Sequence, residues 1–222
     1  MLAYINQKSD NRIIEALKQE GFEVILLAPF FALDYPTDTH ADMLLLDVNG
    51  KIFKHEDYLI DGAFESISEP MGAKYPHDVL LNIAVVGSHA FCNVKHASKT
   101  VLKYLEDNGY TIHRVAQGYA HCSTCIVSDK AIITADDGIY NASCEVGINA
   151  LLIGAGSISL PPYGYGFIGG ASGVTDDAVY FCGSLEYHPD GERIRAFIEK
   201  YGKRVVELYD APLTDVGGIL FK

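Results

Sequence analysis

Two kinds of reactive side chain stand together in the segment GYAHCSTCIVSDK, residues 118–130. His121 precedes Cys122, and Cys125 follows three positions later. A histidine beside a cysteine could supply a thiolate nucleophile and a proton carrier. A Cys-x-x-Cys spacing could instead bind a metal or carry redox chemistry, and small core residues would give the same letters. The segment alone leaves these three interpretations open.

The metal and redox interpretations need a local structure that the sequence does not favour. Ile126 and Val127 continue an apolar run typical of a strand, and residues three apart on a strand point to opposite faces. A zinc site also needs a second ligand pair, and the chain offers no second Cys-x-x-Cys. We therefore expect no metal and no cofactor.

Three segments repeat one pattern, in which an amphipathic helical run ends at a glycine and an apolar strand follows. They are NRIIEALKQEGFEVILLAP (11–29), SKTVLKYLEDNGYTIHRVA (98–116) and GERIRAFIEKYGKRVVELY (191–209). The glycine at each boundary suits a left-handed helix C-cap. Weaker helical patterns at 57–68 and 140–152 fall between them, so that helix starts recur roughly every 45 residues, which indicates an internal repeat.

Strand pairs fill the remainder of each repeat. LLLDVNGKIFK contains an Asn49-Gly50 turn, a strong hairpin signal. CIVSDKAIIT and GVTDDAVYF predict two more hairpins, and MLAYIN could pair with the C-terminal GGILFK. A short polar segment precedes each inner strand: THAD at 39–42, PHDV at 76–79, AHCS at 120–123, GGAS at 169–172 and LTDV at 213–216.

The predicted fold is therefore a single α/β domain over residues 1–222, built as a five-unit pseudo-symmetric α/β propeller. Closing the ring with the N- and C-terminal strands in one unit would remove exposed sheet edges. The alternative is an ordinary α/β sandwich in which three helix–strand units are similar by chance.

Two hairpins carry a resemblance to the guanidino-group-modifying enzymes, or penteins. FIGGASGVTDDAVYFCG (167–183) resembles the Gly-Gly-Asp/Asn strand and hairpin of its hydrolases, and AHCSTCIVSDKAIITADDG (120–138) is similar to the preceding unit. Overall the chain looks most like a bacterial family of this fold that is still uncharacterised. The resemblance implies a hydrolase or transferase acting on a guanidino or amidino compound.

The sequence departs from the family pattern at the catalytic positions that the resemblance implies. Ala171 stands where the enzymes carry Asp or Asn, and Thr214 and Asp215 stand in the unit that supplies their histidine. Asp42 and Met43 stand in the unit that holds their cysteine. These departures favour the alternative of a non-catalytic pentein-fold protein that binds a ligand or another protein, so whether the chain is an enzyme stays open.

The starts of the inner strands would converge on the ring axis, where a pocket is expected. Cys122 is the candidate nucleophile with a lowered thiol pKa, and His121 or His77 is the candidate proton carrier. Carboxylates at Asp42, Asp78 or Asp215 would clamp a cation. The candidate substrate-binding residues together are His40, Asp42, Asp78, Gly169, Gly170, Thr214 and Asp215. Each of these side chains could instead be a packed core residue, a cap or a turn former.

Composition limits the partners. The net charge of −12 excludes a broad nucleic-acid surface, which needs clustered Lys and Arg, and it is compatible with a cationic small molecule. No apolar stretch is long enough to span a membrane. Five scattered cysteines and the lack of a signal-peptide pattern predict a cytoplasmic protein. Gly164 to Gly169 spell G-x-G-x-x-G but lead into a hairpin, which excludes a dinucleotide fingerprint.

Overall fold

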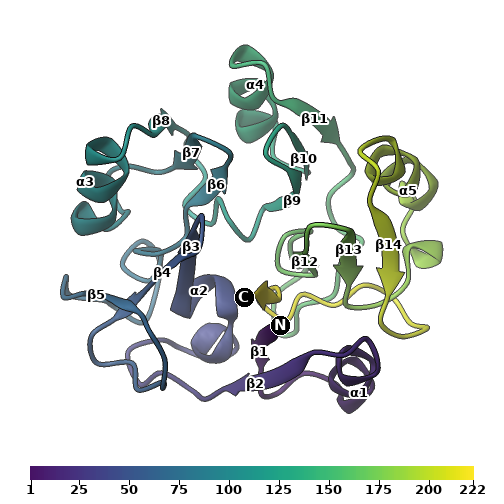
Figure 1. Ribbon diagram of the computed structural model, residues 1–222, viewed down its shortest axis with the longest axis horizontal. Helices are drawn as coiled ribbons and strands as arrows, with labels where there is room; N and C mark the ends of the chain where they lie inside the picture. The colour runs from purple at the N-terminus through teal and green to yellow at the C-terminus, as the bar shows by residue number, and fades with distance from the viewer.

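The computed structural model describes residues 1–222, whose strands form five three-stranded sheets arranged around a central axis (Figure 1). In each sheet the inner strand pairs antiparallel with the middle strand, which pairs parallel with the outer strand. The inner strands are β3 (Leu45–Val48), β6 (Ala84–Val86), β9 (Thr124–Ser128), β12 (Ser172–Val174) and β15 (Leu220–Phe221). The middle strands are β4 (Lys51–His55), β7 (His89–Cys92), β10 (Ala131–Thr134), β13 (Ala178–Phe181) and β1 (Leu2–Asn6). The outer strands are β5 (Glu65–Ile67), β8 (Thr111–Arg114), β11 (Asn149–Leu152), β14 (Arg204–Glu207) and β2 (Glu23–Leu27).

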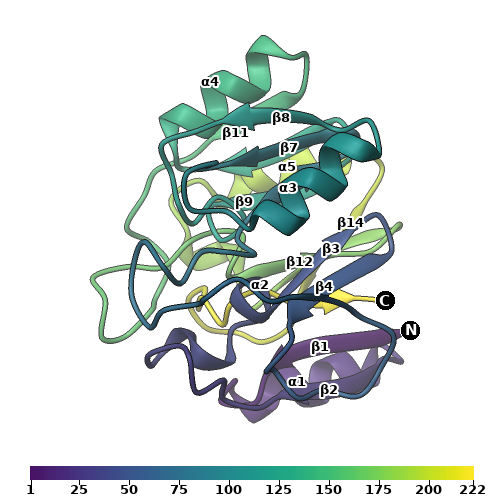
Figure 2. The same cartoon turned by 90° about the vertical axis from the view of Figure 1, so that its left-hand side faces the viewer.

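Helices connect the middle and outer strands in four of the five units and cover the outside of the ring (Figures 1 and 2). They are α1 (Asn11–Gln19), α3 (Lys99–Asp107), α4 (Asp137–Glu145) and α5 (Gly191–Lys200). Asp10, Ser98 and Asp136 cap three of the helix starts by accepting backbone N–H groups. After α1, α3 and α5 the predicted glycines have positive φ, as the repeat pattern required. The short α2 (Ala41–Leu44) precedes β3, and single 3₁₀ turns cover Thr37–Thr39 and Leu185–Tyr187.

Two helical expectations need correction. Residues 57–68 form no helix, because the connection from β4 to β5 is much shorter than the other crossovers and contains Gly62 at φ 143°. In the segment 140–152, the helix lies earlier than expected, over α4, and Asn149–Leu152 form β11. Gly147 at φ 80° ends the helical path between them.

The two chain termini share one sheet, as predicted. β15 pairs antiparallel with β1, with Ala3 opposite Phe221 and Tyr4 opposite Leu220, and both views place the chain ends together (Figures 1 and 2). Each helix packs its buried stripe against its own sheet. Ile13 and Leu17 of α1, for example, contact the apolar face that contains Ile5. None of the helices is long and apolar enough to cross a membrane.

A fourth hairpin, which the sequence did not signal, corrects the register of the second unit. β6 and β7 are joined through Gly87 and Ser88, so the inner strand begins at Ala84. The segment directly before it is therefore Leu80–Ile83 and not PHDV at 76–79. His77 and Asp78 consequently do not occupy the position that we expected for them, and Asn82 does.

Candidate active site

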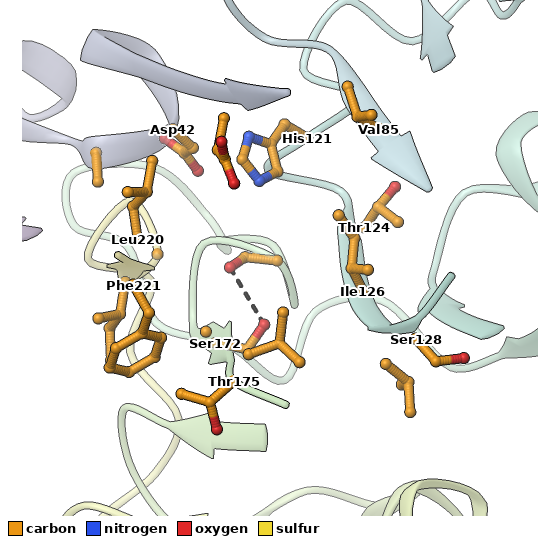
Figure 3. A pocket seen from close by; sticks show the side chains of 18 of the residues that line it. Asp42, Val85, His121, Thr124, Ile126, Ser128, Ser172, Thr175, Leu220 and Phe221 are labelled. Carbon is orange, nitrogen blue, oxygen red and sulfur yellow. Dashed lines mark hydrogen bonds between the residues drawn. The ribbon is translucent and has the colours of Figure 1, made fainter. Parts of the chain in front are cut away.

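A cavity of about 450 Å³ runs along the inner strands. Its floor lies where these strands start and is lined by Asp42, His121 and Gly169, and its rim lies at the hairpin turns. Figure 3 shows Asp42 and His121 at the same end of the cavity, with Ser128 and Thr175 toward the other. The ring topology thus brings polar residues from separate units to one place, as converging strand starts require.

Asp42 is the most unusual group on the floor. Asp42 lies in the first turn of α2 and is 3 % exposed. Its backbone N–H donates to the Gly217 carbonyl at 2.9 Å. Both of its carboxylate oxygens are buried and have no hydrogen-bond donor. Burial and the charge of Asp215 raise the pKa of Asp42, and the neighbouring Cys122 thiol lowers this pKa in part. Asp42 is a buried acid without a partner, which is a costly arrangement.

Asp215 differs from Asp42 because its carboxylate is satisfied. Its two oxygens accept the backbone N–H groups of Phe167 at 2.8 Å and Gly217 at 2.9 Å. Burial raises the pKa of Asp215, and these two donors lower it. The carboxylate occupies the space that a Cβ would need at Gly170. Gly170 is therefore a glycine because the acid lies against its backbone.

His40 lies between the two acids. Its Nδ1 is 4.0 Å from Asp42 Oδ1 and 3.8 Å from Asp215 Oδ1, and its side chain is almost fully buried. Burial lowers the pKa of His40 to about 4. At neutral pH the imidazole is uncharged, so it does not neutralise the two carboxyl groups. His121 is in the same state, since burial lowers its pKa to about 4 and its Nδ1 has no hydrogen-bond partner.

Cys122 is held in place by Asn82. The Asn82 Oδ1 accepts the backbone N–H of His121 at 2.8 Å and that of Cys122 at 3.2 Å, and its Nδ2 donates to Cys122 Sγ at 2.9 Å. Cys122 is 5 % exposed. Burial, followed by the charges of Asp42 and Asp215, raises the pKa of its thiol well above the ordinary value. The expected lowered pKa is therefore wrong, because the thiol is buried and lies near two acids, Asp42 and Asp215.

Aromatic rings pack against the apolar cluster that contains Cys122. Tyr119 packs against Phe167 with ring centroids 6.2 Å apart and against Tyr75 at 5.6 Å. Its hydroxyl donates to Asp78 Oδ2 at 2.8 Å. Cys122 belongs to the same apolar cluster as Tyr119 and Phe167. Asp78 thus supports this aromatic layer and does not line the cavity.

The structure brings most of the predicted site residues together. Seven of them lie around the floor of the cavity or directly behind it: His40, Asp42, His121, Cys122, Gly169, Gly170 and Asp215. His77 and Thr214 do not line the cavity. The backbone carbonyl of His77 accepts the Gly72 N–H, and the Thr214 hydroxyl hydrogen-bonds the Tyr209 hydroxyl at 3.1 Å. The sequence analysis missed Asn82, although counting back from the Gly87-Ser88 turn as in the other hairpins would have identified it.

Solved structures of low sequence identity share this fold. They include a dimethylarginine dimethylaminohydrolase from Pseudomonas aeruginosa in complex with citrulline (TM-score 0.55, 13 % identity, 93 % of this chain and 91 % of that chain). An agmatine deiminase from C. jejuni aligns with TM-score 0.57 and 12 % identity over 95 % of this chain and 87 % of that chain. An amidinotransferase of the saxitoxin pathway from Microseira wollei aligns with TM-score 0.53 and 11 % identity over 93 % of this chain and 78 % of that chain.

These likenesses show that the chain has the α/β-propeller fold of the guanidino-group-modifying, or pentein, superfamily. The sequence matches the family described as "Family of unknown function (DUF6873)" over residues 4–220, and the chain belongs to that family. Among curated proteins no relative matches it.

Proposed function

We propose that this protein is an enzyme that acts on a guanidino or amidino compound, with Cys122 as its nucleophile. The observation that carries the proposal is the unpartnered carboxylate of Asp42, buried at the end of a cavity beside Cys122 and His121. A planar amidinium or guanidinium group presents N–H donors on adjacent edges, which are the partners that a buried carboxylate lacks. Its positive charge would also offset the pair of acids around the sulfur.

The bound cation would supply what the unliganded site lacks. A positive charge next to Cys122 favours the thiolate over the thiol, so the pKa of Cys122 falls when the substrate binds. The thiolate forms beside the electrophilic carbon, and water does not reach it beforehand. The neutral imidazole of His121 is the acceptor for the departing proton, because Asp42, whose pKa is raised, still holds a proton at neutral pH until the bound cation favours its ionised form. This reactivity depends on the substrate and needs no permanently lowered thiol pKa.

The proposed reaction has two steps. The Cys122 sulfur adds to the guanidinium carbon, and the C–N bond to one amine breaks as that nitrogen takes up a proton. The amidino group then remains on the sulfur as a thiouronium cation. Water, in a hydrolase, or an acceptor amine, in a transferase, adds to the same carbon, and the C–S bond breaks to return the thiol.

A non-catalytic ligand-binding protein of the same fold is the second candidate function. The observation that favours it is that Cys122 is 5 % exposed and belongs to the apolar cluster against which Tyr119 and Phe167 pack; this burial also raises the pKa of its thiol. In this case Asp42 would still bind the cation, and Cys122 would be a packing residue.

A covalent-intermediate experiment separates the two candidates. The purified protein is incubated with agmatine, arginine and N-methylated arginines, quenched in acid and measured by intact and peptide mass spectrometry, while released amine and ureido product are quantified. The enzyme proposal expects an amidino adduct on Cys122 and amine release that falls by at least about 100-fold in Cys122→Ser.

Cys144→Ser is the matched control, because Cys144 is exposed on α4; it should retain the wild-type rate. If Cys122→Ser is folded and turns over at the wild-type rate, or if binding occurs without turnover of any of these compounds, the enzyme proposal is overturned and the binding function replaces it.

A further inference from the structure

The mouth of the cavity carries charges of both signs. It lies at the hairpin turns, and its charged side chains are Asp47, Asp129, Asp176, Lys203 and Lys222. The Met1 end of the chain lines the same rim. A charged ligand would gain from this rim only if one of these groups lacked an opposite charge nearby.

Lys203 offsets the two acids in the turns. Its Nζ donates to the backbone carbonyls of Thr175 and Asp176, the latter at 3.0 Å. Burial lowers the pKa of Lys203, and neighbouring carboxylates raise it in part: Asp176, Asp177 and Asp129. Lys203 therefore lies close to both acids of the rim, and most of its own donors are occupied. The turns form neither a free anionic site nor a free cationic one.

Asp47 and Lys222 are the second set of opposite charges at the mouth. Burial raises the pKa of Asp47, and the Gly50 N–H and the charge of Lys222 lower it in part. Asp47 Oδ1 accepts that backbone N–H at 2.7 Å. Lys222 Nζ lies 5.7 Å from the centroid of the Phe64 ring, a cation–π distance. Neither group depends on a ligand for a partner.

Apolar side chains line the wall between floor and mouth. They are Val85 of β6, Ile126 of β9, Val174 of β12 and Ile219 before β15. Figure 3 shows Val85 and Ile126 between the end marked by Asp42 and His121 and the end marked by Ser128. The cavity volume of about 450 Å³ lies in the usual range for small-molecule pockets.

Two hydroxyl groups on the same wall donate to the protein itself. The Thr124 hydroxyl donates to the Ala120 carbonyl at 2.7 Å, and the Ser172 hydroxyl donates to the Gly169 carbonyl at 3.3 Å. An alkyl chain along this wall would therefore displace water without leaving these hydroxyl protons unpaired.

We infer that this cavity selects guanidino or amidino compounds whose tail is an uncharged alkyl chain over those that carry a second charged group. The cationic end would lie at Asp42, the chain along Val85 and Ile126, and the methyl end at the mouth. The inference deepens the proposed function by naming a substrate class, and it rests on that function for the cation at Asp42. A charged tail of either sign would reach a mouth where opposite charges already face each other, so it would lose hydration without gaining a free partner.

The test compares tails of similar length in Cys122→Ser, which cannot form the proposed adduct. Calorimetric titrations use ethyl-, propyl-, butyl- and pentylguanidine, and then agmatine and 4-guanidinobutanoate, which carry a charged end. We expect the affinity to rise about two- to fourfold for each added methylene. Agmatine and 4-guanidinobutanoate should bind at least about tenfold more weakly than pentylguanidine. Thermal shifts of the wild-type protein with the same compounds give the ranking independently of Cys122→Ser.

Two further variants assign the selectivity to the wall and to the mouth. Val85→Thr/Ile126→Thr keeps branched side chains on the strands but adds hydroxyl groups, and it should flatten the dependence on chain length. Lys203→Gln leaves the acids in the turns without their lysine, and it should raise the affinity for agmatine about two- to fivefold relative to pentylguanidine. Leu26→Thr is the control at an exposed position of β2 outside the cavity, and it should leave both ratios unchanged.

Agmatine or 4-guanidinobutanoate binding as tightly as pentylguanidine would overturn the inference, and so would an unchanged chain-length dependence in the folded wall variant. The comparison of compounds stands even if neither further variant folds. Turnover of guanidino compounds with no preference for an alkyl tail would remove this inference and leave the proposed reaction. An alkyl preference in binding with no turnover of any guanidino compound would leave the selectivity and overturn the reaction.

Discussion

The side-chain amide of Asn82 contacts Cys122 at both of its polar groups. Oδ1 accepts the Cys122 backbone N–H at 3.2 Å, and Nδ2 lies 2.9 Å from Sγ. The same Nδ2 donates to the Asp42 carbonyl at 3.1 Å. One residue of the second unit therefore fixes the backbone of the first and third units where the acid and the thiol meet. Asn82 is 1 % exposed, so water cannot replace these contacts.

Replacing Asn82 by Ala should destabilise the fold strongly. Two backbone N–H groups, those of His121 and Cys122, would lose their acceptor in a buried place, and each such loss costs about 1–3 kcal/mol. We expect a fall of about 2–4 kcal/mol in the free energy of unfolding, measured by urea denaturation. Asn93→Ala is the control, because the Asn93 side chain makes a comparable hydrogen bond to the Ala116 carbonyl at an exposed site. Equal losses in the two variants would contradict the role assigned to Asn82.

Cysteine reactivity should follow exposure and not the His-Cys pairing. Cys144 is exposed, while Cys92, Cys122, Cys125 and Cys182 are buried. Burial also raises the pKa of each of these four thiols, and the thiolate is the form that reacts. Brief iodoacetamide treatment near neutral pH should modify Cys144 first, as located by peptide mass spectrometry. Prior labelling of Cys122 in the unliganded protein would mean that its environment is more cationic than the surrounding acids allow.

Gly170→Ala should distort the floor, because the added methyl group would occupy the position of the Asp215 carboxylate. Overpacking of a filled site typically costs about 1–3 kcal/mol, and here it would also displace a satisfied acid. Gly164→Ala provides the matched control, since a Cβ added there would have nothing within 4 Å and the backbone of Gly164 is not in the left-handed region. Thermal unfolding should show a clear loss for the first variant and almost none for the second. Similar melting temperatures would show that Asp215 moves aside without cost.

The sequence predicted the elements whose signals are local. Glycines after the three amphipathic segments ended helices where expected, and Asn49-Gly50 formed its hairpin. The turn at Gly87 and Ser88 lacks the Asn-Gly or Asp-rich signal of the other hairpins, so the second unit was placed too early and Asn82 was overlooked. The pKa of Cys122 could not follow from its neighbour His121, because the acids that raise it come from α2 and from the segment before β15. A single segment of sequence shows which residue types are present, whereas the charges around each residue come from other units of the ring.

Removing residues 1–6 should prevent stable folding. β1 is the middle strand of its sheet, between β15 and β2, and Ala3, Tyr4 and Ile5 are almost fully buried. Two large buried side chains contribute about 1.5–3 kcal/mol each, and the hydrogen bonds to both neighbouring strands are lost as well, against a typical total stability of about 5–15 kcal/mol. Circular dichroism of the truncated chain should show loss of the cooperative transition. Adding the MLAYIN peptide should restore it in part, and a scrambled peptide should not. A truncated chain that melts at the wild-type temperature would contradict the shared sheet.

The buried acid at Asp42 should add a pH dependence to stability between about pH 6.5 and 8. Its pKa is raised to about 8 in the folded state, against about 4 in the unfolded chain, so the folded state holds the extra proton and stability falls as pH rises toward 8. Four histidines with lowered pKa values oppose this trend, because an unfolded histidine is still about half protonated at pH 6.5; they are His40, His113, His121 and His188.

The contribution of Asp42 is therefore the difference between wild-type protein and Asp42→Asn, in which the histidine contributions cancel. Urea unfolding at each pH should show that wild-type protein loses about 1–2 kcal/mol relative to Asp42→Asn between about pH 6.5 and 8. The exposed Glu106→Gln should keep the wild-type profile. Profiles of wild-type protein and Asp42→Asn that run parallel would assign the proton to another group.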